Sequence, residues 1–197
     1  MNENDLRVRK TEEAIRSAFV SLVAEEGFDA VTVQQILERA RVNRSTFYRH
    51  YADKYALAGA LIDEQVAKVQ AVTSDRFSGN QTRENLMSAL NALYADFHDN
   101  RTELRTLMTI RAEGHDLRAQ IERVLRGCFY LYAAEELPAG SDVRFQARVF
   151  SGTAMIVLED MLERDEPRTF ADAINEIRSY VAFIAHAGLA GEAGPCQ

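Results

Sequence analysis

The sequence of 197 residues contains no tryptophan, only three prolines and only two cysteines. The first proline is Pro138, so the first 137 residues lack the residue that most strongly interrupts a helix. Cys128 and Cys196 lie far apart and form no CxxC pair, which excludes a disulfide-stapled scaffold. The scarcity of proline favours a largely helical protein, and the scarcity of cysteine fits a reducing compartment.

Long apolar runs are absent as well. The longest stretch without Asp, Glu, Lys or Arg is 179–191, which is 13 residues long and shorter than the roughly 18 residues that a membrane span needs. That stretch predicts a buried core helix, and no membrane association is expected. The first residues are polar and acidic, unlike a secretory signal, so we expect a cytoplasmic protein.

Positively charged residues are fewer than negatively charged ones. The sequence has 23 Lys and Arg and 30 Asp and Glu, which gives a net charge of −7. This balance excludes a protein that binds nucleic acid over its whole surface. The deficit is uneven, since residues 1–58 are neutral and residues 59–197 carry the whole negative charge. Within 39–54, five Lys and Arg accompany a single Asp. This local positive excess is the first indication of a nucleic-acid site.

Helical periodicity runs through the sequence, whereas period-two alternation and hairpin dipeptides are not found. With 47% apolar residues, enough side chains are available to bury a core. The predicted fold class is therefore all-α. The first four helices are expected at 11–26, 32–40, 44–51 and 54–72, and the last two long ones at 142–163 and 169–190.

Two of the short predicted helices follow one another with a tight turn between them. Thr32 is followed three residues later by Gln35, the spacing of a capping box, and Asn43 is a favourable N-cap for the second helix. Phe47 and Tyr51 stand four residues apart, so that face is expected to anchor the second helix to the preceding ones. The arrangement predicts a helix-turn-helix whose second helix enters the major groove of DNA.

The outward face of the second helix carries polar groups. Arg44 and Tyr48, and likewise Ser45 and Arg49, stand four residues apart on that side. Guanidinium groups suit guanine edges and phosphates, and hydroxyls suit either. The methyl group of Thr46, at the border, suits a thymine methyl or the core.

Residues 11–61 resemble the N-terminal DNA-binding domain of the TetR/AcrR family of bacterial repressors. The resemblance rests on the string VNRSTFYRHYADK, which begins at Val42 and closely follows the signature of that family. It implies an N-terminal three-helix DNA-binding domain at 1–54. It also implies a larger C-terminal helical domain at 55–197 that binds an effector and dimerises.

The resemblance further implies which residues contact double-stranded DNA. The expected base contacts are Arg44, Ser45 and Thr46. The expected phosphate contacts are Thr32, Tyr48, His50 and Lys54, of which the last adds its charge to a helix N-terminus, a favourable place for phosphate. Gln34 matches a position that reaches bases or backbone, and Arg49 matches one whose role varies.

The chain departs from the family at Arg41, where glycine is common. If the turn keeps a left-handed residue there, arginine costs about 1 kcal/mol; otherwise the turn differs locally.

The resemblance implies a homodimer in which the last two long helices pack against their copies in a four-helix bundle. Small residues permit close packing, either between copies or within the chain: Gly152, Ala154, Ala182, Ala185 and Gly188. A small-molecule effector is expected in a mostly apolar pocket. The candidate lining residues, each of which also suits ordinary core or surface, are Phe97, His98, Met108, Arg111, Phe129, Tyr132 and Met155.

Enzymatic and metal chemistry find little support. The carboxylates at 159–166 have no accompanying histidine, glycine-rich loop or nucleophile, which favours a solvated helix end, and the four histidines lack metal-ligand spacing. Cys128 suits inert packing better than a thiol sensor. No cofactor and no enzymatic activity are expected.

The sequence therefore predicts a homodimeric DNA-binding transcription regulator. A repressor is favoured, one that binds a palindromic operator and is released by its effector. The alternative is a helical interaction protein whose degenerate helix-turn-helix no longer binds DNA.

Overall fold

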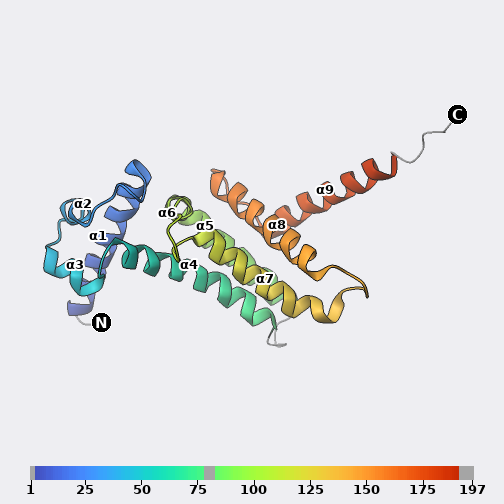
Figure 1. The fold of residues 1–197 in the computed structure, drawn as a ribbon, viewed down its shortest axis with the longest axis horizontal. Helices are drawn as coiled ribbons and strands as arrows, with labels where there is room; N and C mark the ends of the chain where they lie inside the picture. Colours follow the sequence, from blue (N-terminus) through green and yellow to red (C-terminus); the bar gives the residue numbers. More distant parts are fainter. Residues whose placement is uncertain (1–2, 78–82, 191–197) are drawn as a thin grey trace.

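The computed structural model describes residues 3–77 and 83–190, and nine α-helices account for most of these two ranges (Figure 1). They are α1 (Glu3–Glu26), α2 (Val33–Ala40), α3 (Arg44–His50), α4 (Lys54–Phe77), α5 (Arg83–Asp99), α6 (Arg101–Leu107), α7 (Leu117–Glu136), α8 (Val143–Glu163) and α9 (Phe170–Ala190). No strand occurs in these ranges, which contain one isolated bridge between Ala112 and His115. The all-α prediction is confirmed.

Two helices are longer than the apolar periodicity predicted. α1 begins at Glu3 instead of 11, and α4 continues to Phe77 instead of ending near 72. Neither extension contains a glycine or a proline, so nothing interrupts the backbone hydrogen bonds. In α4, the hydroxyl of Thr73 donates to the carbonyl of Val69 at 2.8 Å. Both helices thus continue beyond the stretch that the apolar stripe predicted.

The first three helices pack around an aromatic and aliphatic core at one end of the molecule (Figure 1). Phe19 of α1, Ile36 of α2 and Phe47 of α3 are fully buried. Gly27 ends α1 with a φ of +80°, and its N–H donates to the carbonyl of Val23 at 2.9 Å. The shared core of Phe19, Ile36 and Phe47 holds α3 against α1 and α2.

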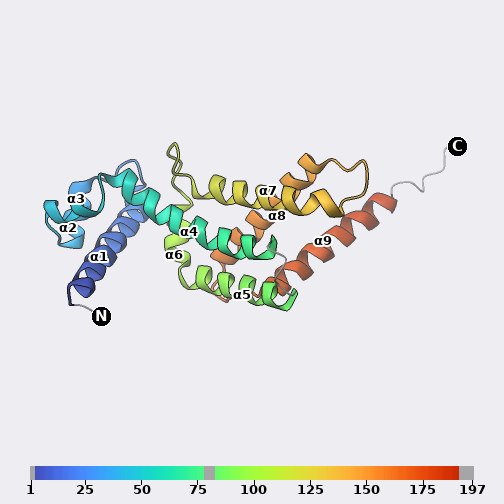
Figure 2. The ribbon, with the colours of Figure 1, turned by 90° about the horizontal axis from the view of Figure 1, so that it is seen from below.

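The long helix α4 leaves this unit and runs into the second part of the molecule, where it packs against α5 and α7 (Figure 2). α8 packs against α7, and the short helix α6 contacts both α1 and α8. Phe97, Leu104 and Leu117 are among the fully buried side chains here. α4 and α6 therefore position the first three helices relative to the rest of the chain.

α9 extends away from the body of the chain in both views (Figures 1 and 2). Its first turns contact α5, whereas all residues at 178–187 are exposed. The prediction of a buried core helix at 179–191 is therefore wrong for the single chain over the described residues 179–187. Tyr180 and Phe183 are 63% and 69% exposed, so this apolar face has no cover within its own chain. No helix in the described ranges, α9 included, has the length and apolar character needed to cross a bilayer.

Candidate nucleic-acid interface

The helix α2 is tied to α1 at both ends. Thr32 Oγ1 accepts a hydrogen bond from the Gln35 N–H at 3.3 Å, and Gln35 Oε1 accepts one from the Thr32 N–H at 2.8 Å, so the predicted capping box is confirmed. Gln35 also donates to Glu26 at 2.7 Å. Near the other end, Arg39 Nη1 lies 2.6 Å from Glu25 Oε1, and this hydrogen bond lowers the pKa of the Glu25 carboxyl.

The turn between α2 and α3 keeps a left-handed residue. Arg41 has a φ of 54° and a ψ of 40°, and no other non-glycine residue in the described ranges has a positive φ. Its N–H donates to the carbonyl of Glu38 at 3.3 Å, and that of Val42 donates to Leu37 at 3.1 Å. Of the two alternatives left open by the sequence, the strained one holds, at about 1 kcal/mol. The exposed Arg41 side chain adds a positive charge beside α3.

The helix α3 is fixed at its start and along one side. Asn43 is the N-cap, and its Oδ1 accepts from the Thr46 N–H and from the Ser45 hydroxyl, both at 2.8 Å. Phe47 is fully buried, and its ring centroid lies 5.8 Å from that of Tyr51. The predicted cap and the predicted anchoring face are both present, so the opposite side of α3 is held at a defined angle.

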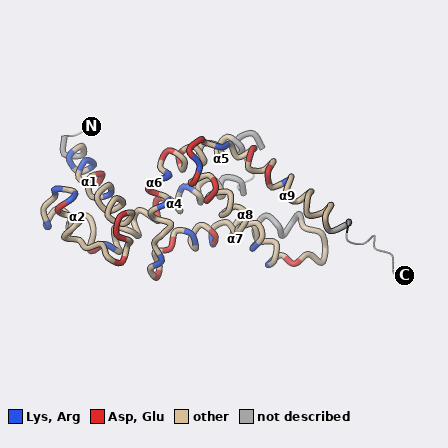
Figure 3. Tube along the Cα trace, turned by 90° about the horizontal axis from the view of Figure 1, so that it is seen from above, with Lys and Arg blue, Asp and Glu red and all other residues tan. Residues whose placement is uncertain are grey.

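Most of the side chains assigned to DNA contacts are exposed. The exposed ones are Thr32, Gln34, Arg44, Ser45, Tyr48 and Arg49, and Thr46 is half-buried. The guanidinium carbon of Arg44 lies 5.5 Å from the centroid of the Tyr48 ring, so the two side chains stack along the helix. Figure 3 shows Lys and Arg positions gathered beside α2 at this end of the molecule. This surface offers cations, hydroxyls and an aromatic ring to a partner.

His50 is oriented differently from the other candidates. Its side chain is only 11% exposed, and its Nδ1 lies 3.1 Å from Glu12 Oε1 on α1. Its Nε2 is buried and has no hydrogen-bond partner. The imidazole therefore joins the end of α3 to α1, and its nitrogens do not face outward as a phosphate contact requires.

The Lys54 side chain is likewise used within the chain. Its ammonium group donates to the carbonyls of Phe28 at 2.9 Å, Asp29 at 3.0 Å and Val31 at 2.8 Å. An ammonium group has three N–H bonds, so all of its donors are engaged. Lys54 Nζ also lies 4.8 Å from the centroid of the Phe28 ring. Lys54 thus fastens the start of α4 to the loop between α1 and α2, a role that the sequence reasoning missed.

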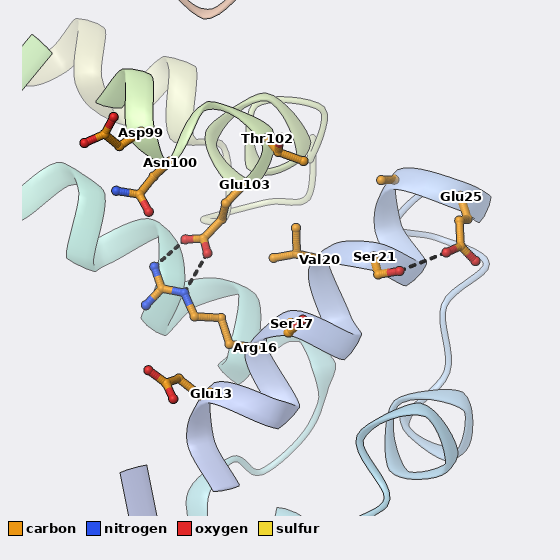
Figure 4. A pocket seen from close by; sticks show the side chains of 11 residues that line it. Glu13, Arg16, Ser17, Val20, Ser21, Glu25, Asp99, Asn100, Thr102 and Glu103 are labelled. Carbon is orange, nitrogen blue, oxygen red and sulfur yellow. Dashed lines mark hydrogen bonds and ion pairs between the residues drawn. The ribbon is translucent and has the colours of Figure 1, made fainter. Parts of the chain in front are cut away.

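One contact joins this unit to the helices that follow, and a second fixes the loop before α7. Arg16 of α1 reaches Glu103 of α6 across an open pocket of about 590 Å³ (Figure 4). His115, in the loop before α7, lies with its ring centroid 6.1 Å from that of Tyr55 on α4. It packs so closely on Gly59 that an added Cβ would lie 3.1 Å from the imidazole. The first contact connects α1 to α6, and the second holds the loop before α7 on α4.

A second cavity, of about 390 Å³, lies among α4, α5, α7, α8 and α9. Its wall includes Tyr94 from α5, Leu125 from α7, Val157 from α8 and Ile174 from α9. Among the described residues that line it there is no Asp, Glu, Lys, Arg or His. The described wall is therefore largely apolar, and none of its residues belongs to α1, α2 or α3.

One of the seven predicted effector residues, Phe97, lies on the wall of this cavity. His98 is buried beside it, but its Nε2 lies 3.2 Å from the carbonyl of Asp165. Arg111 is exposed, and its Nη1 donates to the carbonyl of Ile110 at 3.1 Å. These two polar candidates are thus occupied by backbone groups.

The remaining candidates lie elsewhere. Met108 and Met155 are buried outside the wall, and Phe129 packs on Phe150 with a ring separation of 5.3 Å. The Tyr132 side chain lies outside the described residues. The wall residue Tyr94 was missed, although its apolar helix neighbours Leu90 and Leu93 mark the same face.

The acidic cluster at the end of α8 is part of an ion-pair network. Asp160 accepts from Arg164 at 2.7 Å and from Arg168 at 3.3 Å, and these arginines lower the pKa of its carboxyl. In the described ranges, no group of three or more His, Cys, Asp and Glu side chains is arranged to hold a metal ion.

Residues 15–61 match the family model described as bacterial regulatory proteins of the tetR family. The uncharacterized HTH-type transcriptional regulator YdeS of Bacillus subtilis is 49% identical over 47 residues, which are 24% of this chain and 24% of that protein. The A-factor receptor protein of Streptomyces griseus is 34% identical over 64 residues, 32% of this chain and 23% of that protein. The matched part spans less than half the length of the curated relatives.

Solved structures share the fold over most of the chain. A TetR transcriptional regulator from Streptococcus agalactiae is 23% identical with a TM-score of 0.63, over 90% of this chain and 97% of that chain. A gamma-butyrolactone receptor described as ArpA-like is 20% identical with a TM-score of 0.55, over 79% and 85%. The SmeT–triclosan complex is 19% identical with a TM-score of 0.57, also over 79% and 85%. The likenesses show an N-terminal helix-turn-helix unit followed by a larger helical part.

Proposed function

Because this chain belongs to the TetR family of bacterial regulatory proteins, we propose that it is a DNA-binding transcription regulator that acts as a homodimer and responds to a small molecule. The observation that carries the proposal is the outward side of α3. Arg44, Tyr48 and Arg49 are exposed on a short helix whose opposite side is anchored by the fully buried Phe47. An anchored, cation-bearing helix is what the major groove accommodates.

The proposed contacts follow the exposure of the side chains. Arg44, Ser45 and Thr46 meet base edges, and Thr32 and Tyr48 meet phosphates. Gln34 and Arg49 lie at the margins of the site, where they reach bases or backbone. We assign positioning roles to His50 and Lys54, because Glu12 and three backbone carbonyls hold their polar groups. The residues 1–54 form the DNA-binding domain in this proposal, and 55–197 form the effector and dimerisation domain.

The exposed apolar faces of α8 and α9 support dimerisation. Phe145 and Ile156 of α8 and Phe183 of α9 are 62%, 65% and 69% exposed, which leaves large side chains in water in the single chain. A pair of chains joined through these helices presents two copies of α3 to a palindromic operator, with a spacing of about 34–36 Å. Gly188, one of the small residues expected to aid this packing, lies outside the residues whose burial the structure describes.

The cavity supports a response to a small molecule. The descriptions of two structures with this fold name a small molecule: one is a gamma-butyrolactone receptor, and the other is a complex of SmeT with triclosan. In our proposal, the chain represses transcription while bound to its operator. The effector occupies the cavity and favours a state in which the two α3 helices have the wrong spacing, with a coupling of about 1–3 kcal/mol.

DNA binding is tested by fluorescence anisotropy with duplexes from the region upstream of the neighbouring operon. Specific binding that weakens steeply with salt is expected, and Arg44→Ala and Tyr48→Ala should each reduce affinity about 10-fold or more. Arg105→Ala, an exposed arginine on α6, is the matched control and should leave affinity unchanged. Intact binding in the α3 variants refutes the site. Absence of specific binding by the wild type favours the interaction-protein alternative.

Dimerisation is tested by sedimentation of Phe183→Asp, which should be monomeric and should lose operator affinity. Leu131→Asp on α7 is the control, because Leu131 is 70% exposed and Phe183 is 69% exposed. A dimer that persists in Phe183→Asp and dissociates in Leu131→Asp contradicts the proposed interface.

A further inference from the structure

The cavity is walled by five helices, and the described residues that line it carry no charge. Its volume of about 390 Å³ falls within the range of about 300–1,000 Å³ that is typical of small-molecule pockets. Apolar side chains such as Leu93, Phe97 and Ile177 make up most of the wall. A ligand that enters this space exchanges water for a wall that is mostly hydrocarbon.

The only polar side chains on the described wall are three hydroxyls, those of Thr73, Tyr94 and Thr153. The Thr73 hydroxyl donates within its own helix, to Val69 at 2.8 Å or to Gln70 at 3.0 Å. Tyr94 is packed edge-on against Phe170, with ring centroids 5.6 Å apart, and burial raises the pKa of its phenol to about 12. Its hydroxyl is therefore neutral at physiological pH, and it can both donate and accept a hydrogen bond.

A wall of this composition favours neutral ligands over charged ones, because burying an unpaired charge is costly. A carboxylate, phosphate or ammonium group would lose hydration and find no opposite charge among the described residues of the wall. An ester, ether, ketone or alcohol loses less hydration free energy on entering the cavity and needs only one hydrogen-bond partner there. We propose that the cavity binds a neutral, largely apolar small molecule with one hydrogen-bonding group directed at the Tyr94 hydroxyl, and that it rejects charged analogues. The identification of this ligand as the effector rests on the proposed function.

A matched pair of fluorescent probes tests the ligand class on the full chain. N-phenyl-1-naphthylamine is neutral, and 8-anilinonaphthalene-1-sulfonate has the same ring system with a sulfonate added. The neutral probe should bind with enhanced, blue-shifted emission, and the sulfonate should bind at least about tenfold more weakly. Equal affinities, preference for the sulfonate, or absence of binding because a second copy fills the space would each overturn the proposal.

Two variants and one control locate the bound probe. Ala154→Phe puts a ring on the cavity wall and should abolish binding of the neutral probe, while Ala119→Phe on the exposed side of α7 should not. Tyr94→Phe should weaken binding by about two- to tenfold, the effect of one hydrogen bond. Circular dichroism confirms folding of each variant, and unchanged neutral-probe affinity in folded Ala154→Phe contradicts the site. Operator binding is measured on the same samples, so a failure of the ligand class and a failure of DNA binding are separately visible.

Discussion

Arg16 on α1 and Glu103 on α6 form an ion pair, with the Arg16 Nε 2.7 Å from Glu103 Oε2, across the junction between the first three helices and the rest of the chain (Figure 4). The same guanidinium lies 2.7 Å from Glu64 Oε2 on α4. The hydrogen bond with Glu103 is the largest cause of a raised pKa of Arg16. One side chain thus connects three helices, so α6 and α1 move together or this pair breaks.

Arg16→Ala should lower the free energy of unfolding by about 1–3 kcal/mol, because Glu103 is only 18% exposed and loses its partner. Arg16→Lys should recover part of the loss, since an ammonium group keeps the charge without the planar fork. Urea titration measures both values. The control is Arg105→Ala on the exposed side of α6, and an equal loss there would remove the special role of Arg16.

Asn43→Ala should lower stability by about 0.5–2 kcal/mol and weaken operator binding, because the Thr46 N–H at the start of α3 loses its acceptor. Asn43→Asp separates the two effects. Its carboxylate can still cap the helix, so stability should be kept, whereas its charge repels phosphate and affinity should fall. Thermal unfolding and anisotropy are the two measurements. A fully stable Asn43→Ala would show that the cap contributes nothing.

Arg41→Gly should raise stability by about 1 kcal/mol, because glycine adopts the left-handed backbone of the turn without strain. Operator affinity should nevertheless fall, since a positive charge next to α3 is lost. Arg41→Ala removes the same charge and keeps the strain, so its affinity should match that of Arg41→Gly while its stability does not rise. Equal stability of the glycine and alanine variants would contradict the strain.

Stability should fall in alkali on account of Tyr94, whose phenol has a pKa of about 12 in the folded chain against 10.0 for the unperturbed group. The folded state holds its proton where the unfolded state releases it, so stability is intact below pH 10 and declines as the pH rises towards 12. The total is at most about 3 kcal/mol. Chemical denaturation at pH 9 and pH 11 should show a smaller decline in Tyr94→Phe than in the wild type. The exposed Tyr180 is the control, and an equal benefit from Tyr180→Phe refutes the assignment.

The local features of the helix-turn-helix are predictable from sequence because their causes are local. The capping box of Thr32 and Gln35, the Asn43 cap and the burial of Phe47 depend on spacings of three and four residues, and all are found as expected. The exposure of Arg44 and Tyr48 follows from the same periodicity. Each of these features is settled within one or two helical turns.

The directions of the long side chains are not predictable in the same way. Lys54 is fixed by carbonyls of the loop 28–31, which precedes it by more than 20 residues, and His50 is fixed by Glu12 on another helix. Their positions in the motif suggested phosphate contacts. Which atoms surround a flexible side chain depends on how α1 and α4 pack, and spacing along one helix carries no information about that.

The sequence by itself determined the helical class, the resemblance of the N-terminal part to the TetR family and the outward face of α3, because capping and amphipathic spacing act over a few residues. Only the tertiary structure decided that Arg16 joins α1 to α6 and that the described wall of the cavity includes Tyr94 rather than His98 or Arg111. It also decided that the apolar side of α9 is uncovered within the described part of the chain. Those features arise where helices distant in sequence meet, and their relative placement is set by the packing of the whole chain.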